Sequence, residues 1–424
     1  MLPTADVFDC QPLPPVVLDN LLATADRAWK GLVENAIASE SYPIDKILRN
    51  PTTGRCATLR RPRDIVDATE GVVAHTRTRA TIEEAADFFY IDTPAKAQQF
   101  ARVMDELVEA KRALYPLLDR TIVDNTKLEG GIHKPLDYMS VDWMMIRFKK
   151  GVPARDLCYL EIHKEFHFTC HLTGTTRRGW VRCIHSVRLD CCPDMQKKYG
   201  VIRMEIHRSG HVFMETNEPG VLDYYKLYFG SPRGAVLGNY FNNLYLKGAM
   251  RTSARAILNL DEHFTTERLK PLLSAPLHSN HLQTKACCSC RSSFTWRHPR
   301  KICRACGVAI CGKCSSQWSF MLHDSVIKVS LCGPCVGPSL DDHIESHTNY
   351  TYAKSAKTCR HQDNHKSGFE FKRSKSSPGS MRETLLSVDV SIESQSFTDI
   401  MQGIDQQKEL LVQMQERLAG IVSV

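Results

Sequence analysis

Four pairs of cysteines stand within 49 residues of this 424-residue chain, and each pair has the spacing Cys-x-x-Cys. Two thiolates at this spacing can bind one metal ion from a single tight turn, and two such pairs complete a tetrahedral zinc site with Zn–S distances of about 2.3 Å. Eight ligands therefore predict two zinc ions as cofactors. The ligands are Cys287 and Cys290, Cys303 and Cys306, Cys311 and Cys314, and Cys332 and Cys335.

The gaps between the pairs indicate which of them share a metal ion. They are 12, 4 and 17 residues long, and four residues are too few for the second and third pairs to close comfortably on one ion. We therefore predict a cross-brace, in which the first and third pairs bind one zinc ion and the second and fourth pairs bind the other. Closed sites of four thiolates are structural, because no coordination position stays open for a catalytic water.

The alternative interpretation is a disulfide framework or a set of unrelated buried thiols. Four regular pairs are improbable by chance, and Met1–Asp9 lacks the basic segment and apolar core of a secretory signal. No apolar run approaches the ~18–20 residues that span a bilayer. We therefore expect a soluble cytoplasmic protein with reduced thiols, among which Cys288 is a spare that competes for a metal.

Positive charge is concentrated around the cysteine pairs. The stretch from Arg268 to His323 contains nine Lys and Arg but no Asp or Glu, whereas the whole chain has a formal charge of +8. Two zinc ions with eight thiolates subtract four charges and leave this region basic. Such a patch favours an anionic partner. We expect a membrane surface or an acidic protein, and no nucleic acid.

Other residues near the pairs carry a family resemblance. Phe294 stands four residues after the second ligand, Gly307 ends the sequence Cys-Arg-x-Cys-Gly, and Ser315 directly follows Cys314. With the spacings, these features resemble the FYVE-type zinc finger over residues 285–336. The resemblance implies peripheral binding to endosomal membranes through the phosphoinositide phosphatidylinositol 3-phosphate. A RING-like adaptor of ubiquitin ligation is the alternative, since RING fingers share the cross-brace but usually include a histidine ligand.

The chain departs from all three phosphoinositide-binding motifs of the FYVE family. No Trp-x-x-Asp precedes the first ligand, the basic motif lacks both histidines, and Ser-Leu-Cys replaces Arg-Val-Cys at the third motif. We therefore expect weak or non-selective binding to anionic membranes, with docking on a protein as an alternative. An indole prefers the membrane interface, and each basic side chain gains about 1 kcal/mol beside an anionic leaflet. The residues expected there are Trp296, Arg297, Arg300, Lys301 and Arg304.

The first 270 residues are expected to form one α+β domain. Apolar residues at helical spacing predict helices over Pro14–Ala38, over Ala95–Leu118 and from Gly234 to about Phe264. Segments rich in β-branched and aromatic residues predict strands between the last two helices. These segments are Val141–Lys149, Cys158–Cys170, Trp180–Leu189 and Val201–Glu215.

This order of elements resembles the START (steroidogenic acute regulatory protein-related lipid transfer) family. Three segments carry the likeness: Arg155–Leu160, Arg208–Met214 and Leu222–Leu227. The resemblance implies a helix-grip fold, in which a curved antiparallel sheet and a long C-terminal helix enclose one lipid or sterol. We therefore expect a hydrophobic ligand for residues 1–270, although the apolar stripe of the last helix is also compatible with an ordinary core.

Alternating residues of one segment suggest catalysis or metal binding but fit a strand better. Glu161, His163, Glu165 and His167 lie on one face and apolar residues lie on the other, so we expect a half-buried strand with a polar outer face. A metal at its histidines is a weaker alternative. No nucleophile elbow, phosphate loop or dinucleotide fingerprint occurs, and we expect no catalytic residues and no enzyme activity.

The sequence thus predicts a non-enzymatic zinc protein with three parts. Residues 1–270 form the START-like domain, residues 278–340 form the FYVE-type finger, and residues 341–424 form a polar linker with a short C-terminal amphipathic helix. In that last part, residues 366–380 are rich in Ser and Lys and typical of disorder. Apolar residues between Ile404 and Ile421 approximate fewer than three heptads, so a coiled coil is a weak alternative to a single helix.

Overall fold

The structure is a computed structural model of the chain. It describes residues 7–105, 108–120, 136–147, 153–169, 174–231, 238–274, 284–322 and 325–337. The predictions for residues 341–424, including the disordered segment and the amphipathic helix, lie outside these residues.

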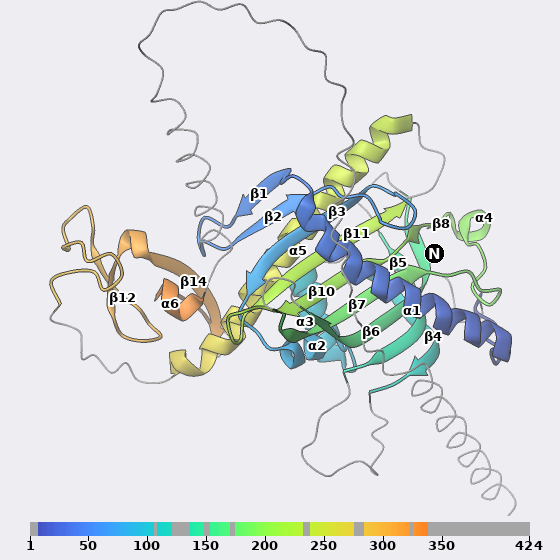
Figure 1. The fold of residues 1–424 in the computed structure, drawn as a ribbon, viewed down its shortest axis with the longest axis horizontal. Coiled ribbons are helices and arrows are strands. Elements are labelled where there is room, and N and C mark those ends of the chain that lie inside the picture. The colour runs from blue at the N-terminus through green and yellow to red at the C-terminus, as the bar shows by residue number, and fades with distance from the viewer. Residues whose placement is uncertain are drawn as a thin grey trace, which may run out of the picture.

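A large antiparallel sheet dominates the described part of the first domain (Figure 1). Its strands follow the order β1-β2-β3-β11-β10-β7-β6-β5-β4, β9 pairs with β11, and β8 pairs with β6 in parallel. The strands are β1 (Lys46–Arg49), β2 (Cys56–Arg60), β3 (Gly71–Thr78), β4 (Val108–Leu118), β5 (Tyr138–Ile146), β6 (Arg155–Thr169), β7 (Thr176–Ser186), β8 (Ile202–Arg203), β9 (Glu205–Ile206), β10 (Ser209–Glu215) and β11 (Leu222–Ser231).

One face of the sheet is covered by α1 (Pro15–Ala38), which follows the predicted helix over Pro14–Ala38. Pro15 stands at the first helical position, where its missing N–H has no intrahelical partner to lose. Apolar residues at helical spacing, Leu18 to Val33 among them, are buried against alternate residues of β6, β7 and β10. Burial of this stripe, rather than helix propensity alone, holds α1 in place.

The other face is covered by three helices. They are α2 (Ile82–Phe89), α3 (Pro94–Met104) and α5 (Gly238–Ser274). Thr81 and Glu84 form a capping box at the start of α2, so the chain turns directly from β3 into this helix. Phe89, Phe100 and Phe264 bring the three helices together over Trp180 and Phe213 of the sheet. An antiparallel sheet closed by a long C-terminal helix is thus present, as expected. Two short helices, η2 (Ser39–Ser41) and α4 (Gln196–Tyr199), lie in connecting segments.

The helix predicted over Ala95–Leu118 is wrong in its second half. Asp105 adopts a left-handed conformation with φ of 53° and ends α3, and the chain returns as the strand β4. This strand pairs only with β5 among the described strands, and Pro116 is tolerated because an edge strand leaves part of its backbone unpaired. Tertiary pairing therefore overrides the apparent helical pattern.

The last helix is longer than predicted, because α5 continues ten residues beyond Phe264, to Ser274. Leu269 and Leu273 are one helical turn apart and are both buried, against the cysteine-rich region rather than against the sheet. The helix thus crosses the boundary expected at residue 270 and physically joins the two folded parts. No helix in the described part of the chain is long and apolar enough to cross a bilayer.

Candidate functional site

The cysteine-rich region, here called the Cys module, comprises the described residues 284–322 and 325–337. Short strands and tight turns position its ligands at the left of Figure 1. β12 pairs with β13, and β14 pairs with β15, both antiparallel. The elements are β12 (Arg300–Ile302), β13 (Ala309–Cys311), η4 (Gly312–Cys314), β14 (Ser315–Leu322), β15 (Ser325–Cys332) and α6 (Gly333–Val336).

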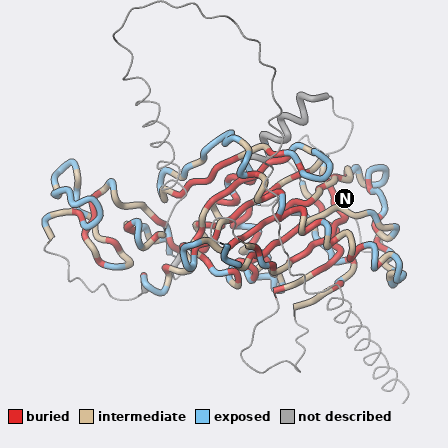
Figure 2. Tube along the Cα trace, in the orientation of Figure 1, coloured by how far each residue is buried: buried red, intermediate tan, exposed pale blue. Residues whose placement is uncertain are grey.

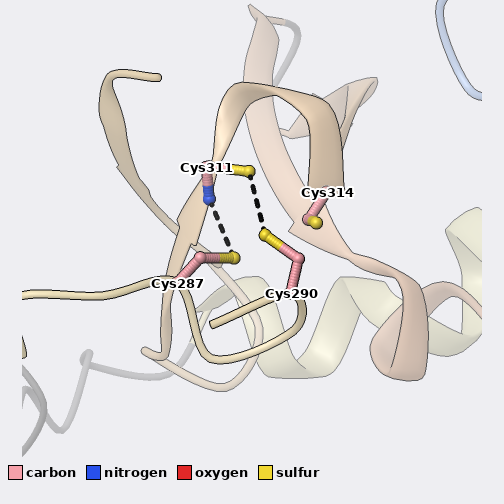
Figure 3. Close-up of side chains that lie close together, drawn as sticks. All are labelled: Cys287, Cys290, Cys311 and Cys314. Atoms are coloured by element: carbon pink, nitrogen blue, oxygen red, sulfur yellow. Dashed lines mark hydrogen bonds between the residues drawn. The ribbon is translucent and has the colours of Figure 1, made fainter. Parts of the chain in front are cut away.

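The eight cysteines gather into the two groups that the spacing predicts. The first group is Cys287, Cys290, Cys311 and Cys314, and the second is Cys303, Cys306, Cys332 and Cys335; within each group all four Sγ atoms lie within 4.8 Å of one another. Figure 3 shows the four side chains of the first group pointing toward one common point. The cross-brace is therefore confirmed as an arrangement of side chains.

Sulfur-to-sulfur distances test whether these groups fit zinc. Cys290 Sγ and Cys311 Sγ are 3.8 Å apart, and Cys306 Sγ and Cys332 Sγ are 3.7 Å apart. A tetrahedron with Zn–S bonds of about 2.3 Å has edges of roughly 3.8 Å. A disulfide needs about 2.05 Å, so the distances contradict a disulfide between these atoms. The donor set and the geometry both fit a zinc ion in each group.

Backbone geometry holds the sulfurs in place. The residue after the first pair, Arg291, and the residue after the second pair, Gly307, adopt positive φ values of 59° and 75°. Each turn is closed by a hydrogen bond of 2.8 Å, from Arg291 N to the Cys287 carbonyl and from Gly307 N to the Cys303 carbonyl. Separately, Cys311 N donates to Cys287 Sγ and Cys332 N donates to Cys303 Sγ, both at 3.3 Å. Glycine suits such a turn at little cost, which accounts for Cys-Gly at Gly307.

The protonation tendencies of the thiols match a site that needs a cation. Side-chain and backbone groups of Ser292 lower the pKa of Cys290 to about 6. Burial and the neighbouring thiols raise the pKa of Cys314 to about 12. Four thiolates so close together repel one another, and a divalent ion relieves that repulsion when it binds. The spare Cys288 is exposed and belongs to neither group.

The residues expected at a membrane fall into two sets. Trp296 is 83% exposed, so it is not a packed cap over the zinc module, and the Arg297 guanidinium lies 4.7 Å from its ring centroid. Arg300 and Lys301 lie on β12, with Arg300 exposed and Lys301 half-buried. Arg304 instead donates to the carbonyl of Leu273 at 2.5 Å, so its guanidinium contacts the end of α5.

The Cys module is attached to the sheet domain by specific contacts. Leu269 and Leu273 of α5 share one apolar cluster with Trp318 and Phe320 of β14. Arg268 donates to the carbonyl of the ligand Cys335 at 3.1 Å and to the carbonyl of the next residue at 2.8 Å. The second predicted zinc site therefore lies directly against α5.

A second set of contacts links the module to the loop between β1 and β2. Gln317 N in β14 donates to the carbonyl of Thr52 at 3.0 Å. Arg55 forms a buried ion pair with Asp261 of α5 and also donates to the carbonyl of Gly337 at 3.4 Å. The module is thus held to the sheet domain on two sides.

The sheet domain contains a buried charged cluster that the sequence interpretation placed at the surface. Glu161 is 2% exposed; its carboxylate accepts from Arg182 and from Lys111, each at 2.7 Å. Lys111 also pairs with Asp142 at 3.0 Å. The period-two alternation of β6 is confirmed, but the expected polar outer face is wrong for Glu161 and His163. They face the side of the sheet that carries Trp180 and is covered by α2, α3 and α5, where partners from other strands compensate their burial.

His163 is part of this cluster but is not placed to bind a metal. Its Nε2 lies 3.2 Å from Glu161 Oε1, and its Nδ1 lies 3.4 Å from the Arg120 guanidinium, so both ring nitrogens have protein partners. Burial lowers the pKa of His163 to about 4. Its neutral form, with Nε2 donating and Nδ1 accepting, satisfies both contacts. Among the described residues, the two cysteine groups are the candidate metal sites.

Apolar residues flank the charged cluster along the same face of β6. Leu157 and Tyr159 pack with Met144 and Met204 on one side, and His163 contacts the Trp180 ring on the other side. The Tyr159 hydroxyl is buried and has no hydrogen-bond partner in the described part of the structure. This face therefore combines apolar surface with a few oriented polar groups.

No protein-family model and no curated protein sequence matches this chain. Solved structures of lipid transfer proteins are similar to it at low TM-scores. Human StAR-related lipid transfer protein 5 is 13% identical, with 58% of this chain and 99% of that chain covered and a TM-score of 0.38. Human STARD10 is 12% identical, with 62% and 86% covered and a TM-score of 0.36. A STAR-related lipid transfer protein from Xanthomonas axonopodis is 12% identical, with 52% and 97% covered and a TM-score of 0.32. Because these scores are low, the functional interpretation of the sheet domain depends on its own topology and side chains.

Proposed function

We propose that the protein is a non-enzymatic, zinc-containing lipid-binding protein that works at membranes. In this proposal, the sheet domain binds one hydrophobic lipid, as a START-like domain does. The Cys module, a FYVE-related finger with two zinc ions, docks the protein on an anionic membrane from the cytoplasmic side, with endosomes as the first membrane to examine. Zinc fixes the fold of the module and supplies no reactive ligand position.

The buried charged cluster is the observation that supports lipid binding. An ordinary core on this face would not contain Glu161 and Arg182, since buried ion pairs rarely stabilise a fold more than apolar residues of the same volume do. Ligand pockets, in contrast, combine apolar walls with a few oriented polar groups. We propose that the ligand lies on the face of the sheet that α2, α3 and α5 cover, with its polar group toward Glu161, Arg182 and the Tyr159 hydroxyl.

Native mass spectrometry of the full chain tests this part of the proposal. The wild type should retain a co-purified lipid, and the Glu161→Met/Arg182→Met double variant should remain folded but lose lipids that carry a polar head. Tyr199→Phe is the control, because this half-buried residue of α4 packs against the cluster on the α1 face, away from the proposed ligand face, and loses only a hydroxyl. A protein that never carries a lipid, in any preparation, contradicts lipid binding.

The exposed pair of Trp296 and Arg297 supports membrane docking of the module. An indole that is 83% exposed beside a guanidinium fits the polar–apolar boundary of a bilayer. Trp296→Ala should reduce flotation with phosphatidylserine vesicles several-fold, because the loss of an interfacial aromatic weakens insertion. Trp296→Phe should retain part of it. If both variants float like the wild type, a protein partner replaces the membrane in this account.

A further inference from the structure

A groove separates the β1–β2 pair from the middle of α5, far from the proposed ligand face at Glu161 along the sheet order. Its volume of about 590 Å³ is within the usual range of ligand sites, about 300–1,000 Å³. Its lining is partly apolar and otherwise mostly basic. The apolar lining residues are Leu48, Leu59, Ala254 and Leu258, and the basic ones are Lys46, Arg49, Arg61, Arg251 and Arg255. Asp45, Asn50 and Asn259 complete the lining, so five basic residues stand against one acidic residue.

The positive charge of this groove is only partly compensated. Arg255 pairs with Asp105 at 3.1 Å and Arg61 with Asp45 at 3.7 Å, and such exposed pairs hold their partners weakly. Lys46 and Arg251 form no ion pair within the described part of the chain. The Arg61 Nε atom, which faces Asp45 in their ion pair, is buried and forms no hydrogen bond among the described residues. The groove is therefore suited to an anion.

Two exposed isoleucines, which neighbour lining residues of the groove in the chain, favour a lipid over a free anion or an acidic peptide. Ile44 and Ile47 flank Lys46 on the edge strand and its approach, and they are 42% and 44% exposed. Exposed isoleucines beside basic residues are typical of surfaces that meet a bilayer, where apolar side chains enter the interface and cations contact phosphates. A soluble anion would use the cations but not the isoleucines.

The groove also adjoins the Cys module. Asn50, which lines the groove, begins the loop whose Thr52 carbonyl accepts from Gln317 N of β14 at 3.0 Å. Figure 1 shows β1 and β2 on the side of the sheet domain that faces this module. A membrane contact at the groove therefore lies next to the part of the protein proposed to dock there.

We propose that this groove binds the anionic head group of a membrane phospholipid, so that the sheet domain contacts the bilayer directly. Arg251 and Arg255, one helical turn apart on α5, offer planar donor groups that match phosphate oxygens. The apolar lining residues accommodate the glycerol and upper acyl region. This inference rests on the proposed membrane function and assigns a second membrane contact, independent of Trp296.

Flotation of the zinc-loaded full chain with phosphatidylcholine vesicles, with and without phosphatidylserine, tests the groove. Arg251→Glu/Arg255→Glu should lower the partition coefficient on phosphatidylserine vesicles at least tenfold, since each basic residue near an anionic surface contributes about fivefold. Lys197→Glu/Lys198→Glu in α4 makes the same charge change on exposed residues outside the groove and should have a much smaller effect. Circular dichroism checks that both variants remain folded.

The possible outcomes distinguish membrane binding by the groove from membrane binding by the Cys module. If Arg251→Glu/Arg255→Glu binds like the wild type while Trp296→Ala does not, the groove assignment is overturned and the proposed docking of the module survives. If the wild type itself does not bind phosphatidylserine vesicles, both fail. Ile44→Ser/Ile47→Ser should also weaken binding; an unchanged partition would mean that the groove attracts any polyanion, which overturns the lipid assignment.

Discussion

The two folded parts of this protein exclude water from their interiors by different means. The sheet domain buries dozens of apolar side chains on both faces of one sheet, and Figure 2 shows buried positions throughout its strands. The Cys module buries few apolar residues besides Trp318 and Phe320, and its ligand sulfurs lie where a larger domain would place aliphatic side chains. Small domains often need metal sites of this kind, because they bury too little surface to be stable through apolar packing alone.

This difference explains how the parts depend on each other. The module completes its small core with Leu269 and Leu273, which belong to the last turns of α5. The sheet domain, in contrast, buries its own apolar clusters without side chains of the module. We infer that metal binding determines the order of the module and of the end of α5, while the sheet is independent of it.

The largest predicted effect is that of metal removal. Chelation should unfold residues 284–337 and release Leu269–Ser274, because structural zinc contributes about 10 kcal/mol or more to such folds. Hydrogen exchange monitored by mass spectrometry should show lost protection in these segments and unchanged protection in β6 and β7. If the sheet strands lose protection together with the module, the two parts form one cooperative unit and the comparison fails.

Removing one charge of the buried charged cluster tests how the sheet domain is stabilised. Arg182→Met leaves the Glu161 carboxylate buried with fewer partners and should reduce the free energy of unfolding of the sheet domain by about 3–5 kcal/mol. The double variant Glu161→Met/Arg182→Met removes both charges and should recover most of that loss. Urea unfolding followed by circular dichroism measures both. Equal destabilisation by the single and double variants would mean that the pair is not coupled.

The contact between the two parts offers a matched pair of leucines. Leu273 is 3% exposed in the shared cluster, whereas its neighbour Leu272 is 48% exposed. Leu273→Ala should reduce the free energy of unfolding of the module by about 2–5 kcal/mol, because it leaves a cavity in a small core. Leu272→Ala should change it by less than about 0.5 kcal/mol. Similar values for the two variants would show that the module does not pack on α5.

The smallest predicted effect is a pH dependence of the sheet domain. The pKa of His163 falls from 6.5 in an unfolded chain to about 4 in the folded protein, so below pH 6.5 the unfolded chain takes up a proton that the folded protein does not. Stability from this residue is complete above pH 6.5 and is lost as the pH falls toward 4. Between pH 7 and pH 5 the loss is on the order of 2 kcal/mol.

His163→Gln provides the comparison for this pH effect, since glutamine can still donate to Glu161 but does not titrate. Its free energy of unfolding should fall less than that of the wild type between pH 7 and pH 5. Any release of zinc over this range affects both proteins equally. Identical pH slopes for the two proteins would contradict a buried, neutral histidine.

Local features of the molecule could be predicted from sequence. Spacing alone paired Cys287 with Cys311 across one zinc site, because a short gap restricts which turns can share a metal. The helical periodicity of α1 and the alternation of β6 were also sufficient, since both patterns reflect one buried face. In each case, the information lies within a short stretch of chain.

Features that depend on distant partners could not be predicted. Glu161 is buried because Lys111, 50 residues away, and Arg182, 21 residues away, meet it in space. The contact of Arg304 with Leu273 and the groove beside β1 likewise depend on how separate elements assemble. The turn from α3 to β4 at Asp105 was also missed, because the residues around it are charged and apolar and include no glycine or proline.

X-ray absorption at the zinc edge of the purified full chain tests the central claim, two metal sites each built from four thiolates, most directly. The account predicts a single shell of four sulfur atoms per zinc at about 2.3 Å. A shell that contains oxygen or nitrogen would contradict it, because at least one of the eight cysteines would then not bind zinc.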